Sequence, residues 1–272
     1  PINYCIALEE NGEKNVHEHT GREPSGQGFN ELTLNKDHLP HNPMINAGAI
    51  MSCSLIQPKQ NAKKRLSHIL DIWQDLTGGK RPGFDKNVYI SERETADRNF
   101  ALGYFMKENG AFPENTNLVE TLELYFQCCS IELNTQNHAI VGATLANAGI
   151  CPTNGKKIFD PGTVKHCLSL MYSCGMYDFS GEFAFTIGIP AKSGVSGALF
   201  IVIPNVMGIT IWAPPLDRIG NSVKGLAFSQ KLVERFNFHN YGNLIQNSEK
   251  IDPRLQKNEM KLKGVNSLCA AA

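Results

Sequence analysis

An apolar, strand-forming stretch in the last third of the chain constrains the fold more than any other feature. Residues Phe183–Ile189, Ala198–Ile203 and Val206–Trp212 are rich in β-branched and aromatic side chains, which predicts three strands. Because only Pro204-Asn205 separates the last two strands, we expect them to form an antiparallel hairpin. A sheet this small has an edge that another segment must pair with or cover.

The rest of the chain is dominated by segments in which apolar residues recur at helical spacing. A long run of helices, then antiparallel strands, then a covering helix predicts an α+β fold. The helices are expected over Pro1–Glu10, Asn46–Ile56, Ala62–Thr77, Ser91–Lys107, Asn117–Glu132, Asn137–Ala148, Pro161–Ser173 and Gly220–Phe236.

Two polar segments are harder to interpret. Asn11–His41 contains several glycines and predicts a long loop, which is either a binding lid or a mobile surface excursion. His239–Ala272 is also polar, and its charged part, Asp252–Lys263, is expected to be a solvated surface.

Composition narrows the kind of ligand. Lysine plus arginine equals aspartate plus glutamate at 26 each, which gives no electrostatic argument for nucleic acid or anionic lipid and favours a small molecule or a protein partner. The 8 cysteines form no C-x-x-C pair, so we expect free buried thiols in a reducing compartment. His17 and His19 have no third ligand at useful spacing, so no metal site is expected. No apolar run approaches the roughly 18 residues of a membrane helix.

Polar residues on the predicted helices are candidates for binding. Glu92 and Asn99 lie seven positions apart on one predicted helix, so they would share a face and could hold the ammonium and carboxylate of an amino acid. Alternatively, Glu92 is simply favoured by the helix dipole in a first turn. Asn46 could cap its helix or approach a ligand. The hydroxyl of Tyr125 needs a partner, from the protein or from a ligand.

A second group of candidates lies next to the predicted sheet. Tyr177 is in a short glycine-bounded link, and Lys192-Ser193-Gly194 stands where an apolar strand begins. The backbone N–H groups of Gly194 and Val195 could bind an oxyanion, or the segment could be a solvent-facing β-turn. A tyrosine, a lysine and a glycine-lined turn at a sheet edge are components of a serine acyl-transfer site, although no suitable Ser-x-x-Lys motif is present.

Taken together, these segments resemble the serine-dependent glutaminases, and in particular the animal mitochondrial kidney- and liver-type enzymes. The resemblance implies a β-lactamase and penicillin-binding-protein-like fold, in which an antiparallel sheet is flanked by a helical cluster. It also implies hydrolysis of L-glutamine to L-glutamate and ammonia without a cofactor, a mitochondrial location and a homotetramer. The similar strings are EPSGQGFNEL (Glu23–Leu32), PHNPMINAGAI (Pro40–Ile50), SERETADRNFALGY (Ser91–Tyr104), LYFQCCSIE (Leu124–Glu132), ATLANAGICP (Ala143–Pro152), LSLMYSCGMYDFSGEFAF (Leu168–Phe185), GIPAKSGVSG (Gly188–Gly197) and PNVMGITIWAPPLDRIGNSVKG (Pro204–Gly225).

The resemblance assigns roles residue by residue. Glu92 would pair with the α-ammonium of the substrate, while Asn46 and Asn99 would orient its α-amino-acid end. Tyr125 would hydrogen-bond the substrate. Tyr177 would relay a proton near the nucleophile, and the N–H of Val195 would form half of the oxyanion hole, so both are expected to be catalytic as well as substrate-binding. The loop Gly21–Leu34 is similar to the family's gating loop.

The Ser-x-x-Lys motif of the family would lie immediately before Pro1. The 272 residues are therefore expected to be a glutaminase catalytic domain that lacks its N-terminal part, including the first strands, the nucleophile and the base, and that is inactive alone. Two alternatives remain open. One is another serine amidase of the β-lactamase-like fold, and the other is a non-catalytic truncated isoform that acts in a mixed oligomer.

Overall fold

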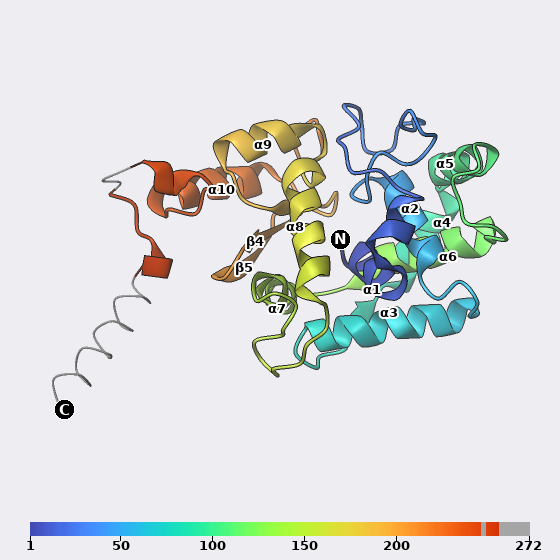
Figure 1. Cartoon of the computed structure of the whole chain (residues 1–272), viewed down its shortest axis with the longest axis horizontal. Helices are drawn as coiled ribbons and strands as arrows, with labels where there is room; N and C mark the ends of the chain where they lie inside the picture. The colour runs from blue at the N-terminus through green and yellow to red at the C-terminus, as the bar shows by residue number, and fades with distance from the viewer. Residues whose placement is uncertain (246–248, 256–272) are drawn as a thin grey trace.

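Helices surround a three-stranded antiparallel sheet in the computed structural model, which describes residues 1–245 and 249–255 (Figure 1). The sheet has the order β3-β4-β5, and a separate two-stranded ladder pairs β1 with β2. The strands are β1 (Gly83–Phe84), β2 (Ile131–Glu132), β3 (Ala191–Ser193), β4 (Ala198–Ile203) and β5 (Met207–Trp212). The helices are α1 (Ile2–His17), α2 (Asn46–Leu55), α3 (Ala62–Leu76), α4 (Lys86–Glu94), α5 (Asp97–Glu108), α6 (Leu118–Cys129), α7 (Thr135–Ala146), α8 (Pro161–Cys174), α9 (Ser180–Thr186) and α10 (Val223–Arg235), with short 3-10 turns η1 (Tyr177–Phe179) and η2 (Gly242–Leu244).

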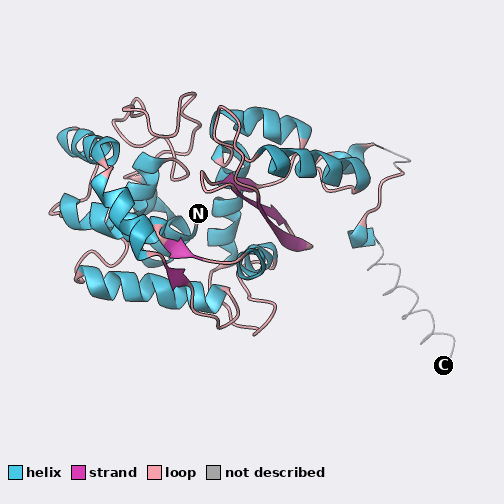
Figure 2. Cartoon of the chain, turned by 180° about the vertical axis from the view of Figure 1, so that it is seen from behind, coloured by secondary structure: helices cyan, strands magenta, loops and turns pink. Residues whose placement is uncertain are grey.

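Strand β4 is the middle strand of the sheet, and both of its faces are buried. Phe200 and Val202 pack into the core of the helical cluster, whereas Leu199, Ile201 and Ile203 pack into a second core with α9 and α10. Successive side chains of a strand point to opposite faces, so an unbroken apolar run suits this position. Figure 2 shows the sheet between the two groups of helices.

The predicted hairpin and α+β class are confirmed. β4 and β5 pair antiparallel from Ala198↔Trp212 to Ile203↔Met207. Asn205 in the connecting turn has φ of 63°, a left-handed conformation that asparagine tolerates better than most residues. The helices expected over residues 62–77, 117–132, 137–148, 161–173 and 220–236 are all present, with ends displaced by up to three residues.

The strand predicted over Phe183–Ile189 is wrong, because most of this segment is helix α9. Phe183 and Ile187 are buried with exposed fractions of 2% and 3%, while Phe185 between them is 82% exposed. Burial four residues apart, with the residue between them exposed, is the pattern of a helix face rather than of a strand. The third strand of the sheet, β3, begins only at Ala191.

The single helix predicted over Ser91–Lys107 is also wrong. The chain forms α4 and α5, which are separated where Thr95 leaves helical geometry at φ of −109° and Ala96 is buried. The cap of α4 is Asp85, whose carboxylate accepts from the N–H groups of Asn87 and Val88. Ser91, the expected first residue of the predicted helix, therefore lies inside α4.

The first helix is longer than predicted. α1 continues to His17, beyond the expected end at Glu10, and Gly12 lies inside it at φ of 77° and ψ of 160° as a kink. The long loop predicted from Asn11 therefore begins only after His17.

The seven cysteines in the described part of the chain are free thiols, and five of them are buried. Cys269 and the end of the predicted polar segment lie outside the described residues.

Candidate active site

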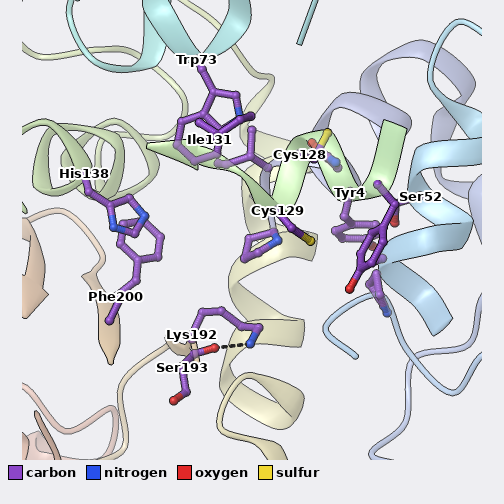
Figure 3. Close-up of a pocket in the computed structure, with 18 residues that line it drawn as sticks. Tyr4, Ser52, Trp73, Cys128, Cys129, Ile131, His138, Lys192, Ser193 and Phe200 are labelled. Carbon is purple, nitrogen blue, oxygen red and sulfur yellow. Dashed lines mark hydrogen bonds between the residues drawn. The ribbon is translucent and has the colours of Figure 1, made fainter. Parts of the chain in front are cut away.

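A cavity of about 260 Å³ lies where the N-terminal turn of α1, the helix α6 and the β3–β4 turn meet (Figure 3). One end of it is apolar and aromatic, and the other end carries Lys192 and Ser193. Tyr125, Lys192, Ser193 and Gly194 are among the residues that line it, and its apolar end is formed by Trp73, Ile131, His138 and Phe200.

Asn46 and Asn99 are brought together from α2 and α5. The Asn46 amide donates a hydrogen bond of 3.2 Å to the Asn99 side-chain oxygen. Asn46 does not cap α2, because the residue in the cap position is Ile45 and the cap makes no side-chain hydrogen bond. The interpretation of Asn46 as a plain helix cap is therefore wrong, and its side chain is instead paired with that of Asn99.

Glu92 lies in the last turn of α4, not in the first turn of a helix. The negative end of the helix dipole disfavours a carboxylate at that place by roughly 0.3–1 kcal/mol, so the helix itself gives no reason for an acid there. Burial raises the pKa of the Tyr125 hydroxyl, and the negative charge of Glu92 adds to the rise. The negative charge of Glu92 thus affects the ionisation of Tyr125, which lines the cavity.

Tyr177 is held in an uncommon backbone conformation beside the β3–β4 turn. Its φ is 55°, which costs a bulky residue free energy, and residues strained in this way tend to cluster at functional sites. The hydroxyl donates to the carbonyl of Ser193 at 3.1 Å. Burial raises the pKa of Tyr177 to about 12, so near neutral pH the hydroxyl is protonated and acts as a donor.

Lys192 is the cationic group of the cavity. Burial lowers the pKa of its ammonium to about 8. Its Nζ lies 4.7 Å from the centroid of the Tyr177 ring, within the range of a cation–π contact, and it donates to the carbonyl of Ser193. The hydroxyl of Ser193 is buried and has no hydrogen-bond partner among the described residues.

The turn between β3 and β4 leaves the backbone N–H groups of Val195 and Ser196 without a hydrogen-bond partner among the described residues. The N–H of Gly194 donates to the carbonyl of Ala198 at 2.9 Å, so the prediction that Gly194 offers an oxyanion donor is wrong. Within the described part of the chain, the N–H of Val195 donates to no protein group. Gly220 lies close to both expected catalytic residues, since a Cβ there would be 3.5 Å from the Tyr177 ring and 3.8 Å from Val195.

Phe29 links the two groups of candidate residues, and the sequence interpretation missed it. Its carbonyl accepts from the backbone N–H of Asn46 at 3.1 Å. Its ring lies 4.8 Å from the ring of Tyr177, centroid to centroid. The residue belongs to the string Glu23–Leu32, so its place in the loop similar to the gating loop was the available signal.

Of the six expected site residues, Asn46 and Asn99 are hydrogen-bonded to each other, the charge of Glu92 affects the pKa of Tyr125, and Tyr177 and Val195 both lie next to Gly220. Of the six, Tyr125 alone lines the cavity, while the others lie next to lining residues or are linked to them through Phe29 and Ser193.

The sequence model of the glutaminase family matches residues 1–241. The chain belongs to the glutaminase family. This places it in the family that the sequence resembles, and the match covers all six expected site residues.

Similar proteins from animals and bacteria are also named as glutaminases. The chain is 47% identical over its whole length to the mitochondrial liver isoform of glutaminase from Rattus norvegicus and covers 45% of that protein. It is 51% identical over 93% of its length to putative glutaminase 2 of Caenorhabditis elegans, of which it covers 42%. A glutaminase of Trichormus variabilis is 42% identical over 87% of the chain, which covers 70% of it. The chain therefore spans less than half the length of its animal relatives.

Solved structures confirm the fold. A Bacillus glutaminase crystallised in the presence of 4.3 M NaCl superimposes with a TM-score of 0.81 at 36% identity, covering 86% of the chain and 80% of that structure. The mixed helix-and-sheet glutaminase fold, which is β-lactamase-like, is thus the fold of this chain.

Two further findings concern the described residues alone. No helix among them is both long and apolar enough to cross a membrane. They also contain no group of three or more histidine, cysteine, aspartate or glutamate side chains placed to hold a metal ion.

Proposed function

We propose that this chain forms most of the catalytic domain of an enzyme that hydrolyses L-glutamine to L-glutamate and ammonia. The observation that carries the proposal is the position of one loop residue, Phe29, which contacts both groups of candidate residues. Phe29 contacts Asn46, which is paired with Asn99, and it also contacts Tyr177, which lies beside the half-buried Lys192. The first group suits an α-amino acid, and the second suits acyl transfer.

Substrate binding would use the groups that lie on helices. Glu92 would pair with the α-ammonium, and the amides of Asn46 and Asn99 would orient the carboxylate end. Tyr125 would hydrogen-bond the substrate from the cavity wall. Because the hydroxyl of Tyr125 is buried, a ligand atom placed beside it would make a strong hydrogen bond.

Chemistry would take place at the turn after β3. A serine hydroxyl attacks the side-chain amide carbonyl, and the oxyanion that forms accepts a hydrogen bond from the N–H of Val195. Ammonia leaves after it receives a proton, and the resulting glutamyl ester is cleaved by water to glutamate. Tyr177, protonated near neutral pH, would pass a proton near the nucleophile, and Lys192 would stabilise negative charge there.

The serine and its lysine base are expected to precede Pro1, as the family resemblance implies. The cavity is lined by Pro1, Ile2 and Asn3 together with Lys192, so residues joined to Pro1 would enter next to the groups assigned to catalysis.

A glutamate-release assay on L-glutamine tests the proposal. It compares the 272-residue chain, a chain extended upstream of Pro1, and the extended Tyr177→Phe variant. We expect activity only in the extended chain, and a loss of about 100-fold or more in kcat when the hydroxyl is removed. Tyr172→Phe is the matched control, because Tyr172 donates only to the carbonyl of Ala184, outside the cavity.

An extended chain that folds but releases no glutamate would overturn the proposal. Turnover of β-lactam or D-Ala-D-Ala probes would then favour another serine amidase of this fold. Inactivity with every probe, together with incorporation into an active relative's oligomer, would favour the non-catalytic isoform.

Location and assembly are part of the same proposal. The rat and mouse relatives are named as mitochondrial, so we propose a mitochondrial protein. The family resemblance leads us to propose a homotetramer. Native mass measurement of the extended chain tests the assembly, and a monomer at all concentrations would contradict it.

A further inference from the structure

The carboxylate of Glu123 on α6 holds helix α4 from the side. The Tyr89 hydroxyl donates to its Oε2 at 2.5 Å, and Nε of Arg93 donates to its Oε1 at 2.7 Å. Tyr89 and Arg93 are one helical turn apart on α4, so both oxygens of a single carboxylate bind one face of that helix.

Helix α4 has little else to fix its middle. None of its residues is buried, and of its side chains Tyr89 alone packs against the core of the helical cluster. Its beginning is tied by the β1–β2 pairing and by the bond from the Asp85 N–H to the Ser130 carbonyl, and its end by the buried Ala96. Between these ends, the packing of the Tyr89 ring and the two bonds to Glu123 join α4 to the body of the molecule.

Glu92 lies on the face of α4 that Glu123 holds. It is three residues after Tyr89, so the two side chains are neighbours on the helix surface. Its charge reaches Tyr125, two residues after Glu123 on α6. The two hydrogen bonds to Glu123 therefore help to fix where the Glu92 carboxylate stands relative to the cavity.

We propose that Glu123 is a positioning residue which, through Tyr89 and Arg93, orients Glu92 toward the α-ammonium of the substrate and thereby sets substrate affinity rather than the rate of amide cleavage. The inference rests on the function proposed above, because it takes Glu92 as the partner of that ammonium. An exposed ion pair contributes little to stability, but Glu123 is only 22% exposed and uses both oxygens.

The test compares Glu123→Gln with Glu120→Gln in the extended chain. Glu120 is an exposed acid on the same helix, where its backbone N–H bonds to Asn117 and its carboxylate holds no partner on α4. We expect Glu123→Gln to raise KM for L-glutamine by ~5- to 30-fold with kcat within about twofold, the range expected for a weakened charge-assisted hydrogen bond. For glutaramate, which is the same amide without the α-amino group, KM should not change.

Hydrogen exchange provides a readout that does not depend on activity. In the 272-residue chain, Glu123→Gln and Tyr89→Phe should each speed exchange of the amides of residues 86–94, while Glu120→Gln should not. Tyr89→Phe keeps the ring and removes only the hydroxyl, so it covers the case in which Glu123→Gln folds poorly.

The outcomes separate the two proposals. Unchanged exchange in α4, or equal losses on glutamine and glutaramate, would overturn the positioning role. A parent protein that does not discriminate between glutamine and glutaramate would overturn the role of Glu92 in the proposed function. In that case the exchange data still decide whether Glu123 holds α4.

Discussion

At the scale of single residues, the charge of Lys192 is the property most sensitive to its surroundings. Its pKa is about 8 in the folded chain against 10.5 for the free side chain, because burial penalises the ammonium. Below about pH 8 both the folded and the unfolded states hold the proton, and the penalty is complete. Between pH 8 and 10.5 the unfolded state holds more protons, so stability rises with pH in that window.

We therefore predict that Lys192→Met stabilises the chain near pH 7 and that its advantage shrinks as the pH approaches 10. The pKa difference would correspond to about 3 kcal/mol, but the side chain keeps some contact with solvent, so we expect about half of that. Urea unfolding at pH 7 and pH 10 measures the change, with the exposed Lys231→Met as control. An advantage that does not vary with pH would show that the ammonium is not the cause.

Asn46 illustrates what a local sequence pattern leaves open at this scale. Asn61 stands just before α3 and caps it by accepting from the Lys64 N–H, as local pattern predicts. Asn46 stands at the start of α2 in a similar context, yet its side chain bonds Asn99, 53 residues away. Local spacing could not distinguish the two asparagines, because the partner of Asn46 is brought near only by the packing of α2 against α5. The family resemblance named both residues of that pair, but not their contact.

At the scale of elements, the end of α7 stores a small strain. The N–H of Gly149 bonds the carbonyl of Thr144 and that of Ala148 bonds Leu145, which is the Schellman arrangement of a helix end. Ala148 occupies its left-handed position at φ of 55°, where glycine is preferred, and its side chain is exposed. We predict that Ala148→Gly raises the free energy of unfolding by ~0.5–1 kcal/mol.

Thermal unfolding of a matched pair checks this prediction. Ala101 is an exposed alanine inside α5, where the same change to glycine should lower stability by ~1 kcal/mol. Opposite signs at the two sites are expected. Destabilisation at both would mean that the left-handed alanine is not strained.

The boundaries of helices were predicted well where the helix buries one apolar face, and poorly where tertiary packing determines the local structure. α3 follows its apolar spacing within one residue of the prediction. The segment Phe183–Ile189 alternates apolar and other residues and so predicts a strand, but burial of Phe183 and Ile187 under the sheet selects a helix. The break between α4 and α5 has no glycine or proline to mark it, and it follows from the docking of Ala96 into the core.

At the scale of the whole molecule, the two cores are joined through β4 and through a close contact of α7 with β5. Gly142 on α7 faces Gly208 on β5. A Cβ at Gly208 would lie 2.3 Å from the backbone nitrogen of Ala143, nearer than any side chain can approach without moving the helix. Since β4 supplies side chains to both cores, a displacement of α7 should weaken them together.

We predict that Gly208→Ala lowers the free energy of unfolding by about 3 kcal/mol and leaves a single transition. Gly181→Ala on α9 is the control, because a Cβ there meets no atom within 4 Å, and it should be neutral or slightly stabilising. The chain has 2 tryptophans, Trp73 in the helical cluster and Trp212 at the end of β5, so each reports on one side of the molecule. Urea titration of Trp73→Phe and Trp212→Phe forms of the variant should give coincident midpoints. If the Trp212 signal is lost first, the sheet and the helical cluster unfold independently, and β4 does not couple them.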